Sequence, residues 1–157
     1  MDIVTLLSTD RIALEPEVSS KKRAFETLSM LLAKGESERV FNHEGIFDSL
    51  FSREKLGSTA LGNGIAIPHA CMDIPGPKAA LLVLDEGIKM DAPDKKPVHV
   101  LLGLLVPSSN PETHHAMLSE LALTINRRDT ASHIRQLGDP ELILDFLASL
   151  FVRDIAA

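Results

Sequence analysis

One histidine follows a segment in which flexible backbone leads into a short apolar run, Gly62-Asn63-Gly64-Ile65-Ala66-Ile67-Pro68-His69. The glycines permit positive φ angles, and the three residues before Pro68 are typical of a buried strand. Because proline gives no hydrogen bond to a sheet, we predict that the strand stops there and presents His69 at its end, aimed off the sheet. An imidazole can attack phosphorus or carry a proton near neutral pH. The alternative is a loop histidine that only bonds backbone.

Two further side chains could act together with His69. His114 shares a predicted helix face with Leu118, Leu121 and Ile125, so we expect it to point toward the sheet. Arg53 stands near the end of another predicted helix, just before the glycine-rich segment, and its forked donors suit a phosphoryl group. From the residues alone, each also has a structural interpretation: His114 as a core histidine, and Arg53 as a surface cation paired with Glu54 or Asp48.

Other chemistries are less well supported. A metal-dependent hydrolase could use His69, His114 and Asp73, but His114 and His115 diverge by about 100° around a helix and do not readily share a metal. Cys71 is the single cysteine, and we interpret it as structural or incidental. The glycine segment lacks the residues of a Walker loop or a dinucleotide fingerprint, so no ATP, NAD or other cofactor is predicted.

Composition narrows the class of protein. The net charge of −6 argues against a nucleic-acid partner, because such proteins need clustered cations. No apolar run approaches the ~20 residues of a membrane span, and the N-terminus does not resemble a secretory signal. A hydrophobic fraction of 45% with only 4% aromatic residues indicates an aliphatic core of helices packed on a sheet. We therefore expect a cytoplasmic protein with no membrane insertion.

The elements that must position these side chains alternate between helix and strand. Apolar periodicity and capping residues predict helices over 20–35, 111–128 and 129–138, another after Asn42 with Arg53 near its C-terminal end, and a last helix from Asp139. Aliphatic runs bounded by turn residues predict strands over 11–15 (stopped by Pro16), 65–67, 78–85 and 98–106, the last of them central. Residues 57–64 and 87–97 are predicted as loops, the latter with a short strand at 88–90. The whole indicates an α/β protein, one domain over 1–157, with a central mixed sheet covered by helices on both faces.

Several segments together resemble a known family. They are Ser52-Arg53-Glu54-Lys55-Leu56-Gly57-Ser58-Thr59, the segment Gly62 to His69, Leu105-Val106-Pro107 and Thr113-His114. The chain is similar to the enzyme IIA domain of the fructose/mannitol class of the bacterial phosphotransferase system (PTS), and more so to its nitrogen-regulatory branch. The resemblance implies that His69 is phosphorylated by a small HPr-like carrier protein, with His114 and Arg53 as supporting active-site residues. Ala70 and Cys71 depart from the family pattern, and His115 is assigned no role.

This resemblance implies a phosphocarrier, a phosphotransferase component that controls partner proteins by its phosphorylation state. Partners in this branch belong to potassium transport or to nitrogen and carbon metabolism, and no metal is needed in principle. Two alternatives remain. One is a sugar-type IIA component that passes phosphate to a IIB protein, and the other is a binding module whose histidines are structural.

Overall fold

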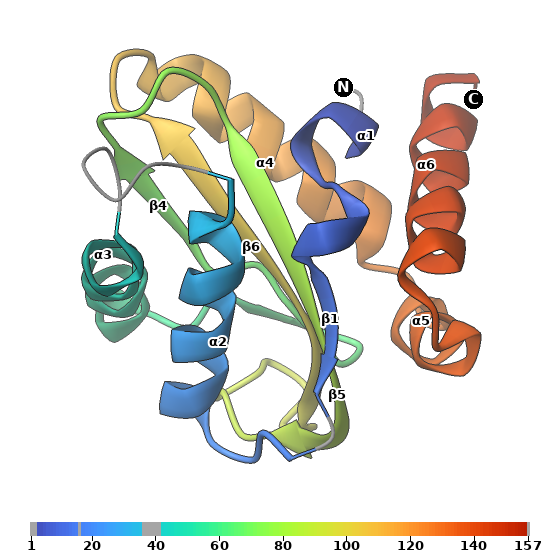
Figure 1. Ribbon diagram of the computed structural model, residues 1–157. Coiled ribbons are helices and arrows are strands. Elements are labelled where there is room, and N and C mark those ends of the chain that lie inside the picture. Colours follow the sequence, from blue (N-terminus) through green and yellow to red (C-terminus); the bar gives the residue numbers. More distant parts are fainter. Residues whose placement is uncertain (1–2, 16, 36–41, 157) are drawn as a thin grey trace.

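A computed structural model describes residues 3–15, 17–35 and 42–156, with side chains described up to residue 151. Pro16, the predicted stop of the first strand, lies outside these ranges. The chain forms a mixed sheet between layers of helices, as the sequence predicts (Figure 1). The helices are α1 (Ile3–Leu6), the 3₁₀ turn η1 (Thr9–Arg11), α2 (Lys21–Ala33), α3 (His43–Leu56), α4 (Pro111–Ile125), α5 (Thr130–Leu137) and α6 (Pro140–Ala156). The strands are β1 (Ile12–Glu15), β2 (Ala60–Gly62), β3 (Ile65–Ala66), β4 (His69–Met72), β5 (Lys78–Ile88) and β6 (Val98–Pro107).

Strand β6 is central, as its uninterrupted aliphatic sequence predicts. The sheet order is β1-β5-β6-β3-β2, and β4 continues the line of β3 along the same edge of β6. The pairing is mixed, because β6 runs antiparallel to β5 but parallel to β3 and β4. Both faces of β6 are covered, which explains why apolar residues do not alternate with polar ones along it.

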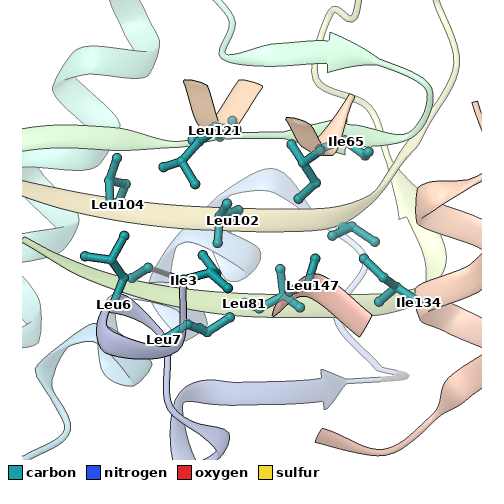
Figure 2. Packing of buried hydrophobic residues seen from close by; sticks show 14 of the residues in the cluster. Ile3, Leu6, Leu7, Ile65, Leu81, Leu102, Leu104, Leu121, Ile134 and Leu147 are labelled. Atoms are coloured by element: carbon teal, nitrogen blue, oxygen red, sulfur yellow. The ribbon is translucent and has the colours of Figure 1, made fainter. Parts of the chain in front are cut away.

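Helices cover the two faces of the sheet as separate layers. Helices α2 and α3 pack on one face through residues such as Phe25, Leu28 and Leu50. Helices α1, α4, α5 and α6 cover the other face, where Leu121 of α4 and Leu147 of α6 meet the strands (Figure 2). No helix in the described part of the chain is long and apolar enough to cross a membrane.

Local capping sets the predicted helix boundaries. Ser20 caps α2 by accepting from the Arg23 N–H at 3.2 Å, and Asn42 caps α3 by accepting from the Gly45 N–H at 2.7 Å. Gly138 ends α5 in the left-handed conformation at φ 60°. One boundary is corrected: α4 ends at Ile125 and not at the arginines that follow, because Asn126 already leaves helical geometry at ψ 69°.

The predicted loop over 57–64 is wrong in part, because it contains β2. Asn63 and Gly64 have φ angles of 56° and 77°, so both central positions of the turn are left-handed. This two-residue turn joins β2 to the antiparallel β3, with Gly62 opposite Ile65. Asn-Gly is the dipeptide that such hairpin turns favour, so the sequence carried the signal.

Two strand limits also differ from the prediction. Strand β3 ends at Ala66, and only Ile67 and Pro68 separate it from β4. The next residue already pairs with β6, so His69 opens β4 instead of ending β3. Strand β5 extends to Ile88, which pairs with Val98 across an irregular register, so the separate short strand at 88–90 is wrong.

A close approach between β6 and α2 gives a stability prediction. A Cβ added at Gly103 would lie 2.8 Å from two side-chain carbons of Leu28, which is fully buried. Gly103→Ala should therefore lower the free energy of unfolding by about 1–3 kcal/mol, measured by urea denaturation. The control is Gly76→Ala, where the added carbon meets nothing within 4 Å. Equal stability of the two variants would contradict this packing.

Candidate active site

His69 is fixed at the place where β3 gives way to β4 along the edge of β6. It is half-buried, and it stands opposite Leu104 in the parallel register. The Leu104 N–H donates to the carbonyl of Pro68 at 2.9 Å, which ties the residue before His69 to the central strand. The imidazole is thus carried by a braced segment of sheet and not by a free loop.

The hydrogen bond of the ring defines its reactive nitrogen. Nδ1 of His69 lies 2.8 Å from the carbonyl oxygen of Ile67. A carbonyl oxygen can only accept, so Nδ1 must carry the proton and Nε2 of the neutral ring holds a lone pair. The backbone contact that would mark a merely structural histidine therefore also prepares Nε2 as a nucleophile.

Burial lowers the pKa of His69 below its ordinary value of 6.5. The Ile67 carbonyl opposes this by favouring the protonated ring; the nearby charge of Arg53 lowers the pKa further, and Glu54 raises it. The net direction is downward, so the ring stays neutral and nucleophilic at pH values where a free imidazole is already protonated.

A ring-proton NMR titration of His69 should therefore give a midpoint below 6.5. Phosphoryl acceptance should persist as the pH falls and should be lost only through this lowered midpoint, since protonation removes the lone pair of Nε2. Arg53→Gln should raise the midpoint by removing a repelling cation. A wild-type midpoint at or above 6.5 would contradict the burial of this ring.

His114 lies on the inner face of α4, as predicted. It is only 8% exposed, and its Nδ1 is buried with no hydrogen-bond partner among the described residues. A histidine that served only to fill the core would be expected to have its polar atoms paired. An unpaired buried nitrogen is typical of a functional site, where a ligand supplies the missing partner.

Arg53 is half-buried in the last turn of α3, where a cation suits the helix dipole. Its Nη1 donates to the carbonyl of Gly57 at 2.9 Å, which holds the guanidinium over the loop that follows the helix. The guanidinium has further N–H donors besides the one bonded to Gly57, and these can bind an anion.

Two hollows bring these residues together around His69. One, of about 170 Å³, is lined by His69, His114, Cys71 and His115, and the other, of about 240 Å³, is lined by His69, Arg53 and Thr59. Leu118 of α4 borders both. The three candidate residues from the sequence therefore line two hollows that share the imidazole of His69.

The metal interpretation finds no support in the geometry. Asp73 lines neither hollow, and the described residues contain no group of three or more histidine, cysteine or carboxylate side chains placed to hold a metal ion. Cys71 is exposed and follows His69 by two positions along β4, which places both on one side of the strand.

Sequence reasoning missed the supports of the site. Glu54 is buried, and its carboxylate accepts from both the N–H and the hydroxyl of Thr59. Ile67 contributes its carbonyl to the ring of His69. A signal existed for Glu54, because it stands one helical turn, four residues, after the buried Leu50 of α3, but a glutamate is usually expected in solvent.

Comparison with known proteins identifies the class to which this fold and site belong. The family model described as "Phosphoenolpyruvate-dependent sugar phosphotransferase system, EIIA 2" matches residues 5–150. The chain therefore belongs to this family of phosphotransferase components, which confirms the resemblance of its motifs.

Within the family, the nitrogen-regulatory branch is well represented among its relatives. A nitrogen regulatory protein of Pseudomonas aeruginosa is 36% identical over 92% of this chain and 94% of its own. The crystal structure of the nitrogen regulatory protein IIA-Ntr from Neisseria meningitidis has a TM-score of 0.77 at 36% identity, covering 95% of this chain and 98% of that one. A fructose-specific EIIA component of Haloferax volcanii is 33% identical over 95% of this chain and 96% of its own.

Proposed function

We propose that this protein is a cytoplasmic phosphohistidine carrier that accepts a phosphoryl group from an HPr-like protein onto Nε2 of His69, and that its phosphorylation state controls partner proteins. The observation that carries the proposal is the hydrogen bond between Nδ1 of His69 and the Ile67 carbonyl, which leaves Nε2 as the nucleophile beside Arg53 and His114. The proposal treats residues 1–157 as one IIA-type domain, since the family match spans 5–150.

The transfer needs positioning and charge stabilisation. The lone pair of Nε2 forms a bond to phosphorus as the bond from phosphorus to the donor nitrogen breaks, and that electron pair returns to the donor ring. Arg53 and His114 hold the phosphoryl oxygens, while the Ile67 carbonyl stabilises the proton on Nδ1 as the ring becomes cationic. Every group in this step belongs to the chain or its donor, and the sequence predicts no metal.

Two exposed leucines on the helices that carry Arg53 and His114 fit a protein partner better than a small molecule. Leu56, at the end of α3 just after Arg53, is 85% exposed. Leu123 of α4, next to a residue of the larger hollow, is 80% exposed. A phosphoryl group on His69 adds about two negative charges to the site, which changes the affinity of any partner that covers it.

The test is incubation with enzyme I, an HPr-like carrier and phosphoenolpyruvate, followed by intact-mass analysis. We expect one phosphoryl group per chain, and no gain when the carrier is omitted. A protein that gains no phosphate while a known IIA protein does so in parallel would be a binding module with structural histidines.

A second candidate function is a sugar-type component that passes the group to a IIB protein. The identity of 33% to a fructose-specific EIIA component over 95% of the chain favours it. Mixing the phosphorylated protein with fructose-type and mannitol-type IIB proteins separates the two candidates: rapid transfer of phosphate indicates a sugar component, and retention of phosphate indicates a regulator.

A further inference from the structure

The carboxylate of Glu54 is the most deeply buried charge beside the site. Its side chain is 1% exposed, and it lies in the last turn of α3 next to Arg53. The ammonium of Lys21, the first residue of α2, lies 3.5 Å from Oε1. A buried carboxylate is costly unless it is paired and hydrogen-bonded, so one in this position has to be held by several contacts.

The other partner of Glu54 is Thr59, on the loop before β2. The Thr59 N–H lies 3.2 Å from both carboxylate oxygens, and its hydroxyl donates to Oε2 at 2.6 Å. The polar contacts that the structure gives to Glu54 thus connect it either to Lys21 at the start of α2 or to Thr59. The short hydroxyl contact is of the charge-assisted kind, which is stronger than a neutral hydrogen bond.

From Thr59 the contacts continue to the imidazole. The carbonyl of Thr59 accepts from the Ile67 N–H at 3.1 Å, and the carbonyl of Ile67 accepts from Nδ1 of His69 at 2.8 Å. Ile67 is therefore held at both its N–H and its carbonyl. A displacement of Thr59 moves the acceptor that decides which ring nitrogen is protonated.

We propose that Glu54 is a positioning residue for phosphoryl transfer, acting through Thr59 and Ile67 to keep the proton of His69 on Nδ1 and the lone pair on Nε2. The inference rests on the proposed function for its kinetic consequence, but the protonated nitrogen can be measured without any transfer. Glu54 lines neither hollow, and its polar contacts among the described residues are with Thr59 and Lys21, so its role is orientation.

The charge of Glu54 has a second effect, which concerns the ring as it becomes cationic during transfer. It raises the pKa of His69, whereas the charge of Arg53 lowers it, although the two residues are adjacent in α3. The arginine faces the larger hollow, and the carboxylate is turned into the interior behind it. Glu54 therefore helps the ring to tolerate the positive charge that develops as Nε2 bonds to phosphorus.

The test uses Glu54→Gln and Thr59→Val, with Thr59→Ser as the variant that keeps the hydroxyl and Glu26→Gln as a half-buried glutamate of α2 outside the site. Nitrogen-15 NMR of the histidine rings, at a pH where His69 is neutral, reports which nitrogen carries the proton. We expect Nδ1–H in the wild type, Thr59→Ser and Glu26→Gln. In Glu54→Gln and Thr59→Val we expect a measurable population with the proton on Nε2 and transfer slowed about ten- to a hundredfold, the range found when metal-binding histidines lose the partners that orient them.

The outcomes separate this inference from the proposed function. A folded Glu54→Gln protein with the wild-type ring tautomer and rate would overturn the inference and leave the carrier function intact. A wild type that takes no phosphate would remove the carrier function, while a tautomer shift in Glu54→Gln would still show that Glu54 sets the protonated nitrogen of His69. If Glu54→Gln does not fold, Thr59→Val decides, because it keeps the carboxylate and the size of the side chain: an unchanged tautomer in that variant overturns the inference.

Discussion

Replacing His69 with alanine should abolish phosphoryl uptake, so that the intact mass stays at that of the unmodified chain after treatment with enzyme I, carrier and phosphoenolpyruvate. His69 alone lines both hollows as an imidazole with a free Nε2, so its loss removes the nucleophile and not a supporting contact. Intact-mass analysis over a time course measures the effect directly.

The matched control for this substitution is His43→Ala. His43 is exposed at the start of α3, so this variant also loses one imidazole without touching the site. It should take up one phosphoryl group at the wild-type rate. If His69→Ala takes up phosphate to the wild-type level, another residue carries the phosphoryl group and the role given to His69 is wrong.

Replacing Arg53 with glutamine should slow phosphoryl uptake by about 10²–10³-fold, the effect of removing one preorganised donor from developing charge. The guanidinium is held over the site by the Gly57 carbonyl, so its remaining donors need little reorganisation when a phosphoryl group arrives. Rapid-quench measurement of the transfer rate from the phosphorylated carrier gives the ratio, and circular dichroism confirms that the variant is folded.

Two control variants distinguish the loss of a positive charge from the loss of the forked donors of Arg53. Lys55→Gln removes one positive charge from the same helix end, where the ammonium lies 5.7 Å from the ring centroid of Phe51 and outside both hollows, and it should change the rate little. Arg53→Lys keeps the charge but loses the fork, so its rate should lie between those of the wild type and Arg53→Gln. An unchanged rate in Arg53→Gln would leave Arg53 as a structural residue that holds Gly57.

Several element boundaries of this fold are set by residues that are close to them in the sequence. Helices α2 and α6 begin next to the predicted capping residues Ser20 and Asp139, and α2 and α5 end next to the predicted Gly35 and Gly138, because those signals act within a few residues. Strand β6 is central because its continuous aliphatic run can be satisfied only with cover on both faces. The segment 57–64 is predicted as a loop because it is rich in glycine, but Asn63-Gly64 within it forms the turn of a hairpin between β2 and β3.

The site was only partly predictable for a physical reason. His69 stands in a distinctive local pattern, and the helical spacing turned His114 toward the sheet, so both could be selected from sequence. The tautomer of His69 depends on the carbonyl of Ile67, and the position of that carbonyl depends on Thr59 and Glu54, which are brought together only by the fold. Every residue has a backbone carbonyl, so residue type does not show which carbonyl accepts from His69. The sequence also does not distinguish a buried helical glutamate from an exposed one.

The most direct measurement is NMR of the phosphorylated protein with nitrogen-15 in its histidine rings, which detects the coupling between phosphorus and the ring nitrogen to which it is bonded. The hydrogen bond from Nδ1 to the Ile67 carbonyl predicts that phosphorus is bonded to Nε2 of His69, with the proton still on Nδ1. Phosphorus bonded to Nδ1 of His69, or to any residue other than His69, would contradict the central claim.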